Sequence, residues 1–419
     1  MSPPGANLLA NLFDLLPPAG RSLVDQVATL ASESGLTAYV VGGPVRDLLL
    51  GRDLLDVDIV VEGDALTLAA SLADLRSVKA VRHPQFGTAT VRADRFALDL
   101  VTARSESYER PGALPSVSPG TIDRDLRRRD FSVNAMAVAL HGPRRGELLD
   151  PTGGEADLRA GVIRALHEGS FRDDATRILR AARYEARFGF QIGSDTGAWI
   201  RRDRTYLDAI SGARIHHEFV RTFEEAEPER CLLRLSNLGA LKAIHSALTF
   251  DSDRARSLGV ARLLHQRGAR SAYWPLLAWS VRPREVETLA SRVALRRSQT
   301  ESIRAVPKVR AIESHLTKRL MRNSRIVEVV SPYPAATLLT LAAMTESSEV
   351  RDKIVRYLRR LRRLWPVLNG DDLLAMGASE GPLIGQVLKR IRVAKLDGEV
   401  SSRADETRLA ERLLRDLSR

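Results

Sequence analysis

Hydrophobic and polar residues alternate in two different ways along the chain, and the change falls near residue 150. Before it, the runs AYVV, VDIVV, TATVRA and FALDLVTA are short and rich in Val, Ile and Ala, which is typical of strands. A helical spacing of apolar residues over 22–35 precedes them and ends at a glycine. After residue 151 the strand pattern nearly disappears, and stretches such as RDDATRILRAARYEARFGF have helical spacing, with Gly189 as a stop. The pattern predicts an α/β head followed by an all-helical remainder.

Length, cysteine content and charge narrow the class of protein. A chain of 419 residues is longer than one ordinary domain, so roughly two to four domains are expected. The single cysteine, Cys231, excludes a disulfide framework and a Cys-rich zinc site, and it favours a reducing, cytoplasmic environment. We expect no signal peptide and no membrane span, because no stretch approaches the roughly 20 apolar residues that a span needs. The net charge of +12 fits a polyanionic partner, although a solvated basic surface has the same composition.

The stretch VVGGPVRDLLLGRDLLDVDIVVEGD, residues 40–64, places two aspartates in one apolar strand. Side chains alternate along a strand, so Asp56 and Asp58 point to the same face about 6.6 Å apart. Two such carboxylates repel each other unless a positive group lies between them. Two Mg²⁺ ions roughly 3.5–4 Å apart fit this separation and would stabilise a phosphoryl transfer. The alternative is a turn with solvated acids at an exposed strand end.

The residues just before the aspartates suit a bound phosphate. Gly42 and Gly43 let the backbone approach a ligand closely, and Arg46 lies at a predicted helix start, where it could hold phosphate charge. The combined pattern, G-G-x-V-R-D and then L-G-R-x-x-x-D-x-D, resembles the class II tRNA nucleotidyltransferases and bacterial poly(A) polymerases of the polymerase-beta superfamily.

The stretch RRDFSVNAMA, residues 128–137, is similar to the second signature of this family. In the family, this element holds the ribose and the triphosphate of the incoming nucleotide. The resemblance implies that Arg128 and Arg129 bind phosphate, for which their fixed donor forks are suited. It also implies that Asp130 and Asn134 hydrogen-bond the nucleotide, Asp130 at a ribose hydroxyl. Read alone, the same residues would equally be a surface basic cluster with a capping aspartate.

The stretch DDATR is similar to the family's E-D-x-x-R motif, with Asp173 in place of glutamate. Asp174 and Arg177 are three residues apart, so we expect them on one face of a helix. Cytosine and adenine each offer an amine beside a ring-nitrogen acceptor, which these two side chains could bind. Uracil and guanine present the reverse pattern and would leave both side chains unpaired, so the pair could select C and A without a nucleic-acid template. The alternative is an ordinary salt bridge on a helix.

Further matches extend the resemblance over most of the chain. Asp99, in FALDLVTA, is a candidate third catalytic carboxylate, and a structural acid paired within the sheet is the alternative. The segment over 109–126 resembles the family's flexible loop, and GARIHHEF resembles its next motif, so His216 and His217 are expected to be structural. The segment over 368–400 is similar to the family's tail, with G-x-D-L, G-P-x-I-G and L-D-G in order.

The resemblance implies an α+β fold with a polymerase-beta-like nucleotidyltransferase head that contains a small mixed sheet. A helical neck with the base-reading motif, a helical body and a helical, tRNA-binding tail are expected to follow. The predicted boundaries are 21–150 for the head, 151–228 for the neck, 229–365 for the body and 366–419 for the tail. Two basic runs, over 296–325 and 351–365, could follow an RNA backbone or be solvated helix faces.

The function implied by the resemblance is template-independent addition of CMP, AMP or both, from CTP and ATP, to the 3′ end of tRNA. Mg²⁺ is the implied cofactor, bound by Asp56 and Asp58, with Asp99 as the third catalytic candidate. A poly(A) polymerase that acts on many RNAs has the same chemistry and is the nearest alternative. A non-catalytic RNA-binding protein on a degenerate head is a second alternative, which the retained acidic and arginine residues argue against. A monomer and a homodimer are both compatible with the sequence.

Overall fold

The structure is a computed structural model that describes residues 7–54, 56–76, 79–93, 96–113, 115–264 and 268–417. The chain divides into two compact units, Met1–Ala243 and Ile244–Arg419, which we call the N-terminal and C-terminal units. No single helix in the described ranges is long and apolar enough to cross a membrane. Two consecutive helices, Asn323–Val330 and Ala335–Met344, reach the required length and composition only when they are taken together, and they are bent by 110° relative to each other.

A seven-stranded mixed sheet forms the centre of the N-terminal unit, in the order β3-β4-β5-β2-β1-β8-β9. Its strands are β1 (Thr37–Val41), β2 (Asp56–Glu62), β3 (Ala80–His83), β4 (Thr88–Ala93), β5 (Phe96–Thr102), β8 (Ala137–Ala139) and β9 (Leu148–Leu149). β2 and β5 are parallel, and the other neighbouring pairs are antiparallel. The four strand predictions correspond to β1, β2, β4 and β5. The short strands β3, β8 and β9 lack the length over which an alternating pattern can be recognised.

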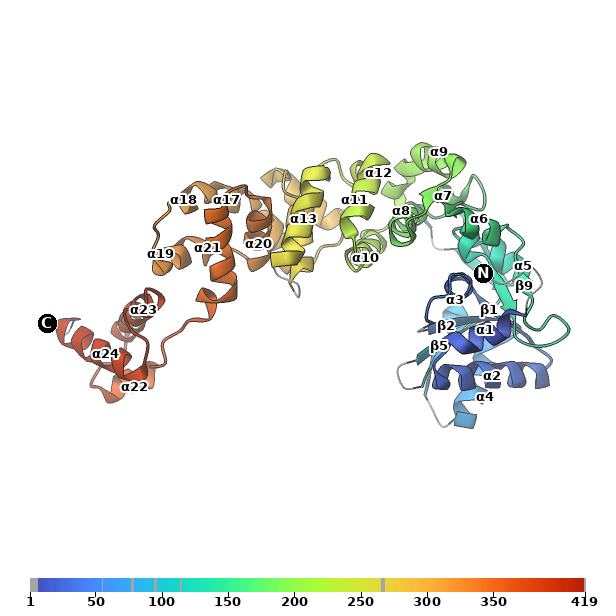
Figure 1. Ribbon diagram of the computed structural model, residues 1–419, viewed down its shortest axis with the longest axis horizontal. Helices are drawn as coiled ribbons and strands as arrows, with labels where there is room; N and C mark the ends of the chain where they lie inside the picture. Colours follow the sequence, from blue (N-terminus) through green and yellow to red (C-terminus); the bar gives the residue numbers. More distant parts are fainter. Residues whose placement is uncertain are drawn as a thin grey trace. The chain divides into compact units, whose positions relative to one another are not determined.

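Helices cover both faces of this sheet. On one face lie α2 (Pro18–Glu33) and α4 (Ala65–Arg76), which pack against each other and against β1, β4 and β5 (Figure 1). On the other face lies α5 (Ile122–Arg127), whose buried Ile122 and Leu126 join a core with Tyr39, Val41 and Val60. Because side chains alternate along β2, Asp56 and Asp58 share a face with Val60. The two carboxylates therefore lie on the face that also carries α5.

The other elements of the N-terminal unit are mostly helices. They are α1 (Leu8–Leu15), α3 (Gly43–Leu49), η1 (Pro84–Phe86), β6 (Arg104–Ser107), β7 (Ser116–Pro119), η2 (Ser132–Asn134), α6 (Gly154–Ala160), β10 (Val162–Ile163), α7 (Ser170–Asp173), α8 (Thr176–Phe188), β11 (Gln191–Ile192), α9 (Ser194–Asp203), η3 (Arg204–Ala209), α10 (Gly212–Phe223), α11 (Pro228–Asn237) and α12 (Ala240–Ile244). α8 ends before Gly189, which has φ +70°, so the predicted stop is confirmed.

Two details differ from the prediction. The segment after residue 151 is not entirely helical, because β10 and β11 form a short parallel pair. The segment over 109–126 is not entirely loop, because β7 pairs with β6 and α5 begins at Ile122. Both strand pairs are too short to produce a recognisable pattern, and α5 is only six residues long.

The C-terminal unit consists of helices over its described residues. They are α13 (Ser252–Leu264), η4 (Ala269–Ala272), α14 (Tyr273–Leu277), η5 (Pro283–Glu285), α15 (Val286–Arg292), α16 (Arg297–Arg304), α17 (Val306–Ala311), α18 (Glu313–Leu316), α19 (Asn323–Val330), α20 (Ala335–Met344), α21 (Ser348–Arg359), η6 (Leu361–Arg363), α22 (Gly370–Ala375), α23 (Pro382–Leu396) and α24 (Arg403–Leu417). One core is built mainly by α17 to α21, and a second, smaller core by α22 to α24.

Candidate active site

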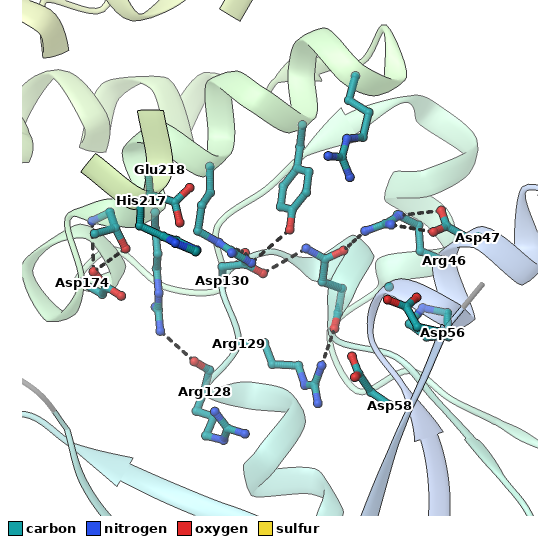
Figure 2. A pocket seen from close by; sticks show the side chains of 18 of the residues that line it. Arg46, Asp47, Asp56, Asp58, Arg128, Arg129, Asp130, Asp174, His217 and Glu218 are labelled. Carbon is teal, nitrogen blue, oxygen red and sulfur yellow. Dashed lines mark hydrogen bonds and ion pairs between the residues drawn. The ribbon is translucent and has the colours of Figure 1, made fainter. Parts of the chain in front are cut away.

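A cleft of about 940 Å³ in the N-terminal unit brings most of the predicted site residues together. Figure 2 shows Asp56 and Asp58 at one end and Asp174 at the other, with Arg128, Arg129 and Asp130 between them. The predicted residues that line the cleft are Gly43, Arg46, Asp56, Asp58, Arg128, Arg129, Asp130, Asn134, Asp174 and Arg177. Gly42 precedes the first of these in the chain, and Asp99 lies opposite Asp58 in the β2–β5 register.

The Asp58 carboxylate of β2 is in an environment that disfavours negative charge. Burial, reinforced by the nearby Asp99 and Asp56 carboxylates, raises the pKa of Asp58 to about 6, although Arg129 acts in the opposite direction. Carboxylate oxygens that lie close together and repel one another are suitable ligands for a hard divalent cation. Within the described ranges, no three His, Cys, Asp or Glu side chains form a ready metal cage. Mg²⁺ commonly needs only one or two carboxylates together with water and substrate phosphates, so Asp56 and Asp58 fit such an ion.

Asp99 is held by its own hydrogen bond within the sheet. The Thr90 hydroxyl on β4 donates to its carboxylate over 2.5 Å. Asp99 also lines a smaller cavity of about 400 Å³, together with Asp58 and Arg129. Its place beside Asp58 is compatible with both the catalytic and the structural interpretation.

Gly42 makes room for Arg129 of the second signature. Gly42 has φ +73°, and a Cβ atom there would lie 2.4 Å from Nη1 of Arg129. A side chain at this position would therefore strain the backbone and displace the guanidinium group. Gly43 begins α3, and the next turn of that helix carries Arg46.

Arg46 is fixed from several sides. Its Nη1 donates to Oδ1 of Asn134 over 2.5 Å, and its Nε and Nη2 donate to the two carboxylate oxygens of Asp47 over 3.0 and 2.9 Å. The guanidinium carbon lies 4.5 Å from the ring centre of Phe188 on α8. Arg46 therefore connects the first signature to the second and to α8.

Asp130 is a buried acid that remains ionised. Burial opposes its charge, but the ion pair with Arg180 and the hydrogen bond from Asn134 outweigh burial and lower its pKa. Nε of Arg180 donates to Oδ2 of Asp130 over 2.7 Å, and Nδ2 of Asn134 donates to Oδ1 over 3.0 Å. A rigid acceptor of this kind suits a sugar hydroxyl, which is the partner that the family resemblance implies for Asp130.

The prediction that Asp174 and Arg177 share a helix face is wrong. Asp174 has φ −144° and ψ 100°, and α8 begins only after it, at Thr176. The Asp174 carboxylate accepts from the backbone N–H and the hydroxyl of Thr176, which stabilises a turn between α7 and α8 instead of a continuous helix. Its other oxygen accepts from Arg214 over 2.6 Å. Both Asp174 and Arg177 nevertheless line the cleft.

Arg177 is oriented by partners other than Asp174. Its Nη1 donates to the Ser170 hydroxyl over 2.7 Å, and its Nη2 donates to the backbone carbonyl of Arg128 over 2.8 Å. The helical salt bridge considered as the alternative for DDATR is therefore replaced by the Asp174–Arg214 pair.

One face of α8 was predicted only in part. Arg180, Tyr184 and Arg187 line the cleft together with the predicted Arg177, and the four are spaced by three or four residues, which is the spacing of one helix face. That spacing is visible in the sequence and could have identified them. Asp125, which holds the two arginines of the second signature, was also missed, because a buried acid on a short helix has no sequence signal.

α10 contributes the last residues of the cleft. His217 and Glu218 both line it, and Glu218 pairs with Arg183 over 2.7 Å in a buried salt bridge. This pair joins α10 to α8, which agrees with the expected supporting role of GARIHHEF.

Two family models match the chain. Residues 38–164 match the poly A polymerase head domain, which includes the carboxylates of β2 and both arginines of the second signature. Residues 189–250 match a probable RNA and SrmB-binding site of polymerase A.

Curated relatives match over most of the chain. An A-adding tRNA nucleotidyltransferase from Geobacter sulfurreducens is 33% identical over 95% of this chain, and this chain spans only 47% of its length. An A-adding tRNA nucleotidyltransferase from Halalkalibacterium halodurans is 32% identical over 93% of this chain and 91% of its own length. A CC-adding tRNA nucleotidyltransferase from Geobacter sulfurreducens is 30% identical over 91% of this chain and 93% of its own length.

Solved structures have the same fold. A CCA-adding enzyme in complex with ATP has a TM-score of 0.83 at 29% identity and covers 100% of both chains. A Thermotoga maritima CCA-adding enzyme in complex with tRNA has a TM-score of 0.80 at 29% identity, with 98% of this chain and 99% of that chain covered.

Proposed function

The chain belongs to the family of the tRNA nucleotidyltransferases, and on this premise we propose that it adds CMP, AMP or both to the 3′ end of tRNA. The nucleotides come from CTP and ATP, and no nucleic-acid template is needed. One observation carries the proposal: a single cleft holds the carboxylates of β2, the arginines after α5, and the Asp174 and Arg177 side chains. The reaction needs all three: carboxylates for the metal at the reacting phosphate, arginines for the triphosphate, and the Asp174 and Arg177 side chains for the base.

The reaction joins the tRNA 3′ oxygen to the α-phosphorus of the nucleotide and breaks the bond between that phosphorus and pyrophosphate. Mg²⁺, held by Asp56 and Asp58, would stabilise the charge that develops on the attacking and leaving oxygens. Asp58 supports this assignment, because burial and the neighbouring acids raise its pKa even with Arg129 nearby, and a divalent cation would offset that cost. Asp99 is the proposed third carboxylate beside them.

The chain's own groups position the nucleotide. Arg128 and Arg129 bind the triphosphate, Gly42 and Gly43 let the backbone approach it, and Arg46 adds charge at the start of α3. In addition, Asp130 accepts from the ribose and Asn134 orients it.

The base is selected at the far end of the cleft. Asp174 accepts from the exocyclic amine of cytosine or adenine, and Arg177 donates to the adjacent ring nitrogen. Uracil and guanine would leave the base-facing lone pair of Asp174 and the base-facing N–H of Arg177 unsatisfied, which is a basis for rejection. The carboxylate of Asp174 has lone pairs beyond those used by Thr176 and Arg214, so an additional donor can be accommodated.

The tRNA body is proposed to contact the basic helices that follow the site. We retain the division into a head (21–150), a neck (151–228), a body (229–365) and a tRNA-binding tail (366–419) as part of this proposal. A cytoplasmic location belongs to it as well, because tRNA maturation requires access to free CTP, ATP and tRNA.

The test uses three tRNA transcripts that lack CCA, CA or only the final A. Each is incubated with CTP, ATP or both, and an unrelated RNA serves as the comparison. We expect one to three added nucleotides on at least one tRNA and no long tail on the unrelated RNA. Long A tails on the unrelated RNA would instead favour a poly(A) polymerase, and no addition to any RNA would favour a non-catalytic RNA-binding protein.

A further inference from the structure

A buried carboxylate lies behind the two arginines of the second signature. Asp125 is on α5, and its side chain is completely buried. Its Oδ1 accepts from Nε and Nη2 of Arg128 over 3.0 and 2.5 Å, and its Oδ2 accepts from Nε and Nη2 of Arg129 over 3.3 and 3.0 Å. One carboxylate therefore binds two guanidinium groups side by side.

Arg129 has acidic groups on two sides. Asp125 lies behind it, and Asp58 lies on the cleft side, close enough for the two charges to interact (Figure 2). Arg129, Asp58 and Asp99 line one cavity. Opposite charges in a partly buried site attract strongly, so a guanidinium group without Asp125 would pair with the acids of the sheet.

Arg128 is less dependent on Asp125. Its Nη1 also donates to Oε1 of Glu106 over 2.7 Å, and its Nε also donates to the backbone carbonyl of Arg104 over 3.2 Å. Arg129, in contrast, has Asp125 as its carboxylate partner, together with the carbonyl of Asn134 at 3.4 Å. Loss of Asp125 would therefore release Arg129 first.

The position of Asp125 is tied to the catalytic strand. The backbone N–H of Ile122, at the start of α5, donates to Oε1 of Glu62 over 2.7 Å. Glu62 lies on β2 with Asp56 and Asp58. The strand that carries the two acids thus also fixes the helix that carries Asp125.

We propose that Asp125 is the positioning residue that aims Arg128 and Arg129 at the triphosphate and keeps Arg129 from pairing with the acids opposite. This inference rests on the proposed function, because it takes both arginines as triphosphate ligands. The geometry leaves donors for that task. Each guanidinium group has five N–H groups, and Arg129 uses one each on Nε, Nη1 and Nη2 for Asp125 and the Asn134 carbonyl. Two of its N–H groups therefore remain for phosphate oxygens.

The test compares equilibrium binding of ATP, inorganic triphosphate and adenosine to the full chain, without divalent metal, in wild type and Asp125→Asn. The affinities for ATP and inorganic triphosphate should both fall roughly tenfold to a hundredfold, as expected when a buried charge-assisted pair is broken. The affinity for adenosine should stay the same, because the base subsite does not depend on Asp125. Asp123→Ala is the matched control, since Asp123 is on the same helix but pairs with Arg127 at the surface.

A double-mutant cycle separates positioning from a general structural effect. If Asp125 acts mainly through Arg129, Asp125→Asn should have little further effect on triphosphate affinity in an Arg129→Ala background. If the Asp125→Asn protein does not fold, Asp125→Glu replaces it. This variant keeps the charge but moves it by one methylene, and it should also lose affinity for ATP and triphosphate but not for adenosine.

Unchanged or tighter triphosphate binding by a folded Asp125 variant, or an equal loss of adenosine binding, would overturn the inference. A failure of the proposed function is a different result, because the wild type itself would then bind neither ATP nor CTP and would extend no tRNA.

Discussion

Among the single residues of the cleft, Asp58 is in the least favourable environment for its charge. Its pKa is raised from 3.8 to about 6 by burial and by the neighbouring acids. Between these two values the folded protein binds the proton more strongly than the unfolded chain does, so the free energy of unfolding falls as the pH rises through this range. Above pH 6 the ionised group destabilises the metal-free fold.

Asp58→Asn should therefore stabilise the metal-free protein above the raised pKa, by about 1–3 kcal/mol, and the difference should disappear below the unfolded pKa. Thermal unfolding of both proteins across this pH range, in a chelating buffer, measures the effect. Asp56→Asn is the control and should change stability less, because Asp56 is exposed. An Asp58→Asn protein that is no more stable than wild type above pH 6 would argue against a strained carboxylate.

Asp174 is predicted to decide nucleotide choice. Under the proposed function, a wrong base leaves the base-facing acceptor of Asp174 and the base-facing donor of Arg177 unsatisfied, and Asp174→Ala removes part of that penalty. The variant should relax discrimination against UTP and GTP, which is measured by incorporation of all four nucleotides. Asp173→Ala is the matched control, because Asp173 does not line the main cleft and pairs with His167 at 3.6 Å. If Asp174→Ala keeps its preference for C or A at ordinary activity, Asp174 does not select the base and has only a structural role.

Single residues also show what the sequence could and could not predict. Asp56, Asp58, Arg128 and Arg129 were found because strand alternation and motif spacing are local properties of the chain. Asp125 was not found, because its role comes from burial between two arginines, which only the tertiary structure produces. The helical placement of Asp174 was wrong for a related reason: its side chain bonds to Thr176 and Arg214, and the residue lies in the turn before α8.

At the scale of elements, the turn from β1 to α3 has a glycine, Gly42, at the point where it contacts the Arg129 side chain. The four strands and the helix α8, which ends before Gly189, were predicted well, because each has a sustained pattern of its own. The close approach of Gly42 to Arg129 has no counterpart in any local pattern.

Gly42→Ala should weaken triphosphate binding, because the new Cβ atom would displace the Arg129 guanidinium group. Gly51→Ala is a matched control at the other end of α3. Gly51 has φ +66°, similar to the +73° of Gly42, but a Cβ atom there would meet nothing within 4 Å. Both variants should lose stability, by about 1 kcal/mol from backbone strain. Only Gly42→Ala should raise the KM for ATP or CTP; equal nucleotide kinetics in the two variants would contradict the role of Gly42.

At the scale of the whole molecule, the proposed reaction centre lies in the N-terminal unit, and the proposed tRNA surface lies on the helices that follow. The sequence is sparse in aromatic residues, at 5%, yet one of them is prominent in the C-terminal unit. Trp365 is 60% exposed, and the guanidinium carbon of Arg392 lies 3.6 Å from its ring centre. An exposed ring beside a cation is a suitable surface for an RNA base.

Trp365→Ala should raise the KM for tRNA roughly fivefold or more, as expected for the loss of one base-stacking contact, without changing the KM for ATP or CTP. Steady-state kinetics with each substrate varied in turn measures this. Leu263→Ala, which removes another exposed apolar side chain, is the control. A tRNA KM that is unchanged in Trp365→Ala would exclude this ring from the tRNA surface.

The most direct test of the account is single-turnover addition of a nucleotide to end-truncated tRNA by wild type and by Asp56→Ala, with Mg²⁺ present. Asp56 is exposed in the cleft, so its loss should leave the fold intact. We predict that the wild type extends the tRNA and that Asp56→Ala is slower by at least about a hundredfold, while nucleotide binding is largely retained. Near-wild-type rates for Asp56→Ala, or a wild type that extends no tRNA, would contradict the account.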